Sequence, residues 1–135
     1  MSRKVLAGLA VVAASGTAAV ASASAHTTVF PTIIHVTHAA TTPVGGGFQV
    51  EVNGYLTSPT SKCRKSRTVK LYLIAGGTTT LKDVDLSSLR GEFGVRGKTV
   101  SHPDAFTIKV IRKRIDRRLG PSHRHVCGGA KVTEG

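Results

Sequence analysis

The fold class is decided by residues 48–56, which read FQVEVNGYL. From Phe48 to Leu56, every second residue is apolar or glycine, and the residues between them are polar or Tyr55. Side chains of an extended strand alternate between its two faces. The pattern therefore predicts a β-strand with one buried face and one face in contact with solvent.

Similar runs follow along the chain and predict an all-β protein. Alternation recurs in four further runs, at residues 69–74, 83–86, 93–95 and 106–111. An earlier strand is expected from about Thr32 to His38. Val, Ile and Thr make up 33 of the 110 residues from position 26 onward, and β-branched side chains favour strands. Because clusters of Gly, Pro and Ser separate the runs, we expect six or seven strands in an antiparallel sandwich or small barrel.

Two parts of this pattern carry specific expectations. In the run at residues 83–86, we expect Val84 and Leu86 in the core and the carboxylates of Asp83 and Asp85 on a solvated outward face. These acids are too few for a calcium site, which needs several more oxygen ligands. Residues 26–30 and the last few residues are expected to be frayed ends.

Residues 1–25 have the pattern of a secretory signal peptide. Arg3 and Lys4 provide a positively charged start, residues 5–14 are apolar or small, and residues 23–25 read ASA, which fits an A-x-A cleavage site. The apolar run is too short to span a bilayer. We therefore expect a signal peptide at 1–25, a secreted domain at 26–135 and no transmembrane segment.

The chain has two cysteines, Cys63 and Cys127. In an oxidising compartment an even number of cysteines predicts a disulfide, and two cysteines allow one intramolecular pairing. The alternatives are a metal site or a reactive thiol, but neither cysteine belongs to a C-x-x-C pair. We therefore predict a structural Cys63–Cys127 bridge.

A resemblance to a known class of proteins rests on the order of several short motifs. Residues 63–72, which read CRKSRTVKLY, resemble the cysteine-bearing strand of small secreted bacterial β-sandwich proteins of immunoglobulin-like or prealbumin-like type. In such proteins a strand ending in Gly-x-(V/L) comes before that cysteine, here at residues 48–56. A Gly-x-(W/F) turn, here 91–93, a basic strand, here 106–114, and a cysteine-bearing tail, here 125–130, come after it. The match departs from the pattern in having no Trp. The resemblance implies an immunoglobulin-like sandwich and export, and it implies no activity.

Positive charge is the strongest functional signal. The chain carries 19 Lys and Arg against 7 Asp and Glu, a formal net charge of +12. Two basic clusters, around residues 62–70 and 109–124, supply the candidate polyanion-binding residues: Lys62, Arg64, Lys65, Arg67, Arg112, Lys113, Arg114, Arg117 and Arg118. Such a surface attracts polyanions through counterion release. The alternative is that these residues only keep a small sandwich soluble and protect the edges of its sheets.

Histidine offers a second hypothesis. Cleavage after Ala25 would make His26 the N-terminal residue, whose amine and imidazole can hold copper together with another histidine. The candidates for that second ligand are His35, His38, His102, His123 and His125. A site made of His123, His125 and Cys127 would need a thiolate, which a disulfide removes. Because no spaced ligand motif occurs, the main prediction includes no metal and no cofactor.

The sequence therefore predicts a secreted, monomeric, all-β protein with an antiparallel immunoglobulin-like sandwich of six to seven strands and one disulfide. Its predicted role is that of a non-enzymatic structural or binding module for anionic cell-wall or surface polymers. The few aromatic residues argue against a dedicated nucleic-acid reader, which needs stacking side chains. The alternatives are a cationic antimicrobial or cell-wall-associated factor and a copper-binding domain that uses His26.

Overall fold

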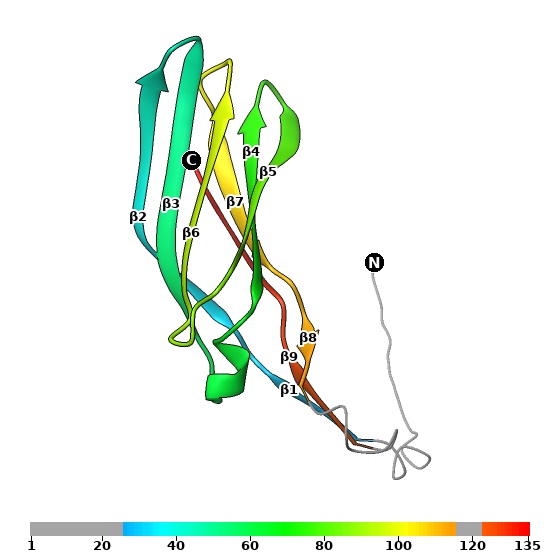
Figure 1. Cartoon of the computed structure of the whole chain (residues 1–135). Helices are drawn as coiled ribbons and strands as arrows, with labels where there is room; N and C mark the ends of the chain where they lie inside the picture. The colour runs from blue at the N-terminus through cyan, green and yellow to red at the C-terminus, as the bar shows by residue number, and fades with distance from the viewer. Residues whose placement is uncertain (1–25, 116–122) are drawn as a thin grey trace, which may run out of the picture.

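The computed structural model describes residues 26–115 and 123–135 (Figure 1). The predicted signal peptide at 1–25 and two of the predicted basic residues, Arg117 and Arg118, lie outside the described residues. The described chain is all-β, apart from a 3-10 turn, η1, at Ser61–Cys63. The prediction of the fold class is confirmed.

Two antiparallel sheets pack face to face as a β-sandwich (Figure 1). The first sheet has the order β2-β3-β6, with β2 at Ile33–Val44, β3 at Gly47–Thr57 and β6 at Glu92–Thr99. The second has the order β10-β7-β4-β5, with β10 at Ala130–Glu134, β7 at Ala105–Val110, β4 at Thr68–Ala75 and β5 at Thr78–Leu86. These two sheets hold seven strands, in agreement with the six or seven predicted.

A third, small sheet extends from one end of the sandwich (Figure 1). It has the order β1-β9-β8, with β1 at His26–Phe30, β9 at His123–Cys127 and β8 at Lys113–Arg114. Strand β1 runs parallel to β9, and the N–H of Gly128 donates to the carbonyl of Phe30 at 2.8 Å. The expectation of frayed ends was wrong, because residues 26–30 pair with β9 and residues 130–134 pair with β7.

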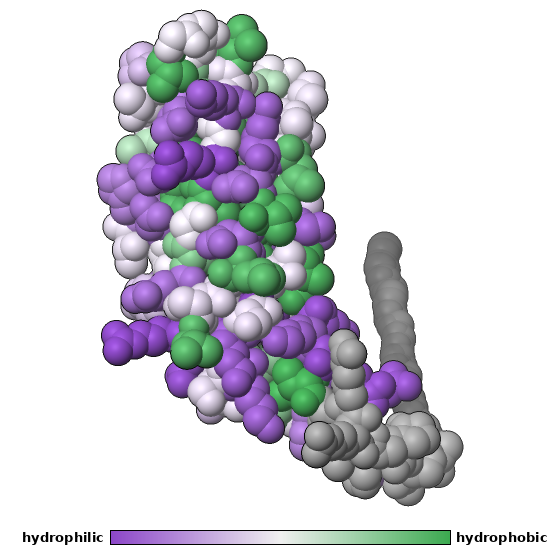
Figure 2. Space-filling model, viewed as in Figure 1, coloured by the Kyte–Doolittle hydropathy of each residue, from purple (hydrophilic) through white to green (hydrophobic). Residues whose placement is uncertain are grey.

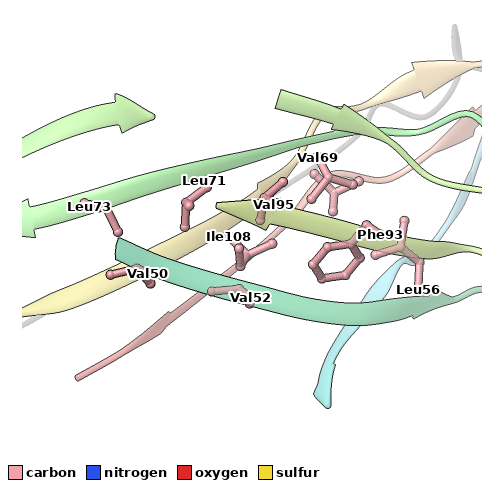
Figure 3. Packing of buried hydrophobic residues seen from close by; sticks show 10 residues of the cluster. Val50, Val52, Leu56, Val69, Leu71, Leu73, Phe93, Val95 and Ile108 are labelled. Atoms are coloured by element: carbon pink, nitrogen blue, oxygen red, sulfur yellow. The ribbon is translucent and has the colours of Figure 1, made fainter. Parts of the chain in front are cut away.

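The core lies between the two large sheets and follows the predicted alternation in all strands but one. Figure 3 shows Val50 and Val52 of β3 packed near Leu71 and Leu73 of β4 and Ile108 of β7. Val52, Leu71 and Ile108 are fully buried. The strand predicted from residues 48–56 therefore supplies one wall of the core.

Strand β5 is the exception. The face that was predicted to be buried is exposed, and the face that was predicted to be exposed turns inward. Val84 is 50% exposed and Leu86 is 62% exposed, whereas Asp83 and Asp85 are half-buried. The two carboxylates turn toward the edge of β6, where the Oδ2 of Asp83 accepts the N–H of Arg96 at 2.9 Å. The Oδ2 of Asp85 accepts the N–H of Gly94 at 3.0 Å. The carboxylates thus satisfy donors on the outer edge of β6, which pairs with no further strand of its sheet among the described residues.

The surface is mixed in polarity. Figure 2 shows green apolar surface between purple polar side chains along the body of the sandwich. Among the exposed large apolar side chains are Val100, which is 81% exposed, and Leu89, which is 78% exposed. In the part of the chain that the structure describes, no helix has the length and hydropathy needed to cross a membrane.

Candidate functional site: an arginine-lined cleft

Three arginines line a cleft of about 370 Å³ on the small sheet. Arg112, Arg114 and Arg124 form its polar wall, and Thr27 and Val126 are the other described residues that line it. All three arginines are exposed to solvent. Their positive charges therefore gather around one concave surface.

Strand pairing explains why these residues meet. Arg112 and Arg114 are two residues apart, which places them on one face of an extended chain. Arg114 of β8 lies opposite Val126 of β9, and Arg124, two residues before Val126, lies on that same face and opposite Thr27 of β1. The cleft therefore draws its lining from three segments that are distant in sequence.

The chemistry of the cleft suits an anion. A guanidinium group stays charged at all ordinary pH values and can donate two parallel hydrogen bonds to a phosphate, sulfate or carboxylate. The described residues that line the cleft are these three arginines with Thr27 and Val126. Because like charges held close together repel one another, an anion between the arginines would lower the electrostatic energy of the site.

The structure brings the two predicted basic clusters into contact. The Nζ atom of Lys113 lies 3.5 Å from the carbonyl oxygens of Lys65 and of Ser66. Lys62 and Lys65 are exposed around η1, and Arg64 beside them is half-buried. The basic residues at 62–65 and at 112–114 therefore lie at the same end of the molecule.

Arg67 does not belong to this surface, and its assignment as a polyanion-binding residue was wrong. Its side chain is fully buried, with 0% of its area exposed. Its Nη1 atom donates to the Oγ1 of Thr32 at 2.9 Å and to the carbonyl of Cys63 at 2.8 Å. Its Nη2 atom donates to the carbonyls of Ile111 at 2.9 Å and of Gly128 at 2.8 Å.

The buried guanidinium is a structural crosslink. The acceptors of Arg67 come from the chain before β2, from η1, and from the segments that join β7 to β8 and β9 to β10. Burial lowers the pKa of the Arg67 guanidinium because the charged form loses its hydration. The group nevertheless stays protonated, since the ordinary pKa of arginine is far above neutrality. The hydrogen bonds of Nη1 and Nη2 replace the water that burial removes from these two atoms.

The disulfide lies next to this crosslink. Cys63 and Cys127 are bonded, and their Cα atoms are 5.3 Å apart. The bridge joins the 3-10 turn after β3 to the last residue of β9, so it attaches the small sheet to the sandwich. The predicted pairing is confirmed, and it removes Cys127 as a metal ligand.

Three of the described histidines, His35, His102 and His125, contact aromatic rings. The ring of His35 stacks on Tyr55 with centroids 4.6 Å apart, and its Nε2 lies 3.0 Å from the Oγ1 of Thr57. The ring of His125 packs edge-on against Phe30. Among residues 26–115 and 123–135, no three His, Cys, Asp or Glu side chains gather in a way that could hold a metal ion. The copper hypothesis for His26 stays a prediction.

Sequence reasoning missed one side of the cleft. Thr27 was assigned to a frayed end, so nothing indicated that β1 would complete the site. The basic residue Arg124 stood out in the sequence, but its position opposite Thr27 depends on the parallel pairing of β1 with β9. Such a pairing between the start and the end of a domain has no local sequence signal.

Comparisons with known proteins identify no relative. No family model matches the chain, no curated protein matches its sequence, and no solved structure matches its fold. The resemblance to immunoglobulin-like or prealbumin-like secreted proteins therefore stays a prediction.

Proposed function

We propose that the protein is an exported, non-enzymatic binding module that holds anionic polymers at the arginine-lined cleft. The observation that carries the proposal is the convergence of Arg112, Arg114 and Arg124 on one concave surface. The proposal assigns no bond-making or bond-breaking step to the protein.

The geometry favours a ligand with repeated phosphate or other anionic groups. Three guanidinium groups around one cleft can contact more than one anionic group of a chain. The exposed Lys62 and Lys65 at the same end of the molecule would extend the contact along the polymer. Anionic polymers of a cell wall or cell surface are the class of partner that fits this chemistry.

Export is supported by two independent features. A disulfide is typical of proteins that fold in oxidising compartments, and the structure contains one. The signal-peptide pattern of residues 1–25 points in the same direction. A cationic antimicrobial or cell-wall-associated role stays an alternative that uses the same basic surface.

The test is binding to fluorescently labelled long-chain polyphosphate, measured by anisotropy over a series of salt concentrations. We expect the double variant R112Q/R124Q to weaken binding at least ten-fold and to reduce the salt dependence, because fewer counterions are released. The matched control is K62Q/K65Q, which removes the same two charges from the same end of the molecule but leaves the cleft intact. We expect its effect to be several-fold smaller.

Two outcomes would contradict the proposal. Equal losses in the two double variants would show that net charge, and not the cleft, attracts the polymer. A wild-type protein that does not bind polyphosphate at low salt would exclude the cleft as a polyanion site. Circular dichroism of each variant would confirm that the sheets are unchanged.

A further inference from the structure

The outer face of the β10-β7-β4-β5 sheet carries a row of three lysines. Lys131 of β10 lies opposite Lys109 of β7, and Lys109 lies opposite Lys70 of β4. Adjacent strands are about 4.8 Å apart, so the three side chains emerge side by side. Lys109 and Lys131 are exposed, and Lys70 is half-buried. Like charges directly opposite one another destabilise a sheet, so charge repulsion within the row opposes folding.

An apolar strip borders the row on the same face. Lys70 lies opposite Val84 of β5, Thr68 lies opposite Leu86, and Tyr72 lies opposite Leu81. Leu81, Val84 and Leu86 are 45%, 50% and 62% exposed. A register shift in β5, between the partners of Leu71 and Tyr72, brings Leu81 onto the same face as Val84. The face is therefore cationic across three strands and apolar along the fourth.

Among the described residues of these four strands, none that points outward on this face is acidic. The side chains that point outward from the four strands, by their register, are Lys131, Thr133, Ala105, Thr107, Lys109, Thr68, Lys70, Tyr72, Ile74, Thr79, Leu81, Val84 and Leu86. The carboxylates of β5 turn the other way, toward β6. The reversed orientation of β5 thus removes two negative charges from this face and exposes two apolar side chains on it.

We propose that this outer face docks on an anionic lipid surface. The lysines would contact headgroup phosphates, and Leu81, Val84 and Leu86 would enter the boundary between headgroups and acyl chains. Charge complementarity selects an anionic partner. The apolar strip selects a lipid surface over a hydrated polymer, because a polymer offers no apolar phase in which these side chains can be buried. The surface is separate from the arginine-lined cleft in its residues and in its strands.

The absence of Trp from the chain allows a direct test in the full-length protein. Val84→Trp places a single reporter on the proposed docking face. Tyr55→Trp places a matched reporter on the outer face of the opposite sheet, where Tyr55 is 38% exposed. With phosphatidylglycerol vesicles, we expect the emission of the Val84→Trp protein to shift to shorter wavelength and that of the Tyr55→Trp protein to stay unchanged. Because both proteins carry the same residues 1–25, attachment through that segment would not produce this difference.

The lysines are tested in the Val84→Trp protein. We expect K70Q/K109Q/K131Q to raise the lipid concentration at half-maximal shift by roughly 100-fold, since each lysine near an anionic surface contributes about a five-fold increase in partitioning. We expect R112Q/R124Q to leave most of the shift intact, which separates this surface from the cleft of the proposed function.

Three results would overturn the proposal. The first is an equal shift of both reporters, and the second is an equal shift with phosphatidylcholine vesicles. The third is a shift that the triple lysine variant does not weaken. Loss of polyphosphate binding in R112Q/R124Q has no bearing on these readouts, so the two proposals can fail independently.

Discussion

The carboxylate of Asp83 on β5 accepts the backbone N–H of Arg96 on β6 at 2.9 Å. This hydrogen bond crosses from one sheet of the sandwich to the other, and the bond from Gly94 to Asp85 repeats it two residues away. Strand edges with unsatisfied donors promote association between chains. Here the side chains of β5 occupy the edge of β6 and join the two sheets along one side of the sandwich.

We call these two hydrogen bonds, from Arg96 to Asp83 and from Gly94 to Asp85, the seam between the sheets. Replacing both carboxylates tests what the seam contributes to stability. We expect D83A/D85A to lower the free energy of unfolding by about 2 kcal/mol, because two charge-assisted hydrogen bonds are lost. We also expect the variant to self-associate through the exposed edge of β6. Urea denaturation and size-exclusion chromatography measure the two effects. Glu92→Ala is the control, since Glu92 is exposed and its side chain is not part of the seam. Equal stability of the two variants would show that the seam contributes nothing.

Arg67 is the most buried charged residue described, and its replacement should be costly. We expect Arg67→Lys to lower the free energy of unfolding by about 3 kcal/mol or more, because an ammonium group cannot reach all four acceptors of the guanidinium. Arg64→Lys is the matched control, since Arg64 is three residues away and only half-buried. Chemical denaturation compares the two. A polyanion-binding role for Arg67 would instead produce a loss of binding with unchanged stability.

Reduction of the disulfide should affect the small sheet most. The bridge closes a loop with a sequence separation of 64, for which chain entropy predicts about 4 kcal/mol of stabilisation. We expect the variant C63S/C127S to lose most of this amount. Loss of the disulfide should increase the rate of amide hydrogen exchange more at Phe30 and Val126 than at Leu71 and Ile108. The reason is that β1 and β9 lie outside the main core. Uniform acceleration in all strands would contradict this division.

Gly54 of β3 leaves room for the backbone of the neighbouring strand β2. A Cβ atom at this position would overlap the carbonyl oxygen of His35. We expect Gly54→Ala to lower the free energy of unfolding by about 2 kcal/mol or more, since backbone must move to relieve the overlap. A Cβ at Gly45 would meet no atom within 4 Å, so we expect Gly45→Ala to have little effect. Thermal unfolding of the two variants measures the difference, and equal melting temperatures would refute it.

The alternation of apolar and polar residues correctly predicted the buried face of a strand wherever the opposite sheet covers that face. Residues 48–56 and 69–73 bury the predicted face because two packed sheets exclude water from one side of each strand. The same reasoning failed at β5, an edge strand of its sheet. There the carboxylates turn inward and accept backbone N–H groups of β6, and a register shift is a second departure from strict alternation.

The sequence by itself determined the all-β class, the turn positions, the strong positive charge and the pair of cysteines that form the bridge. These properties are local or compositional, so they can be read one segment at a time. Only the tertiary structure decided which basic residues share a surface. It buried Arg67, aligned Lys70 with Lys109 and Lys131, and placed Arg124 beside Arg112. The physical reason is that strand register and the pairing of distant segments depend on the free energy of the whole assembly, and no single segment encodes them.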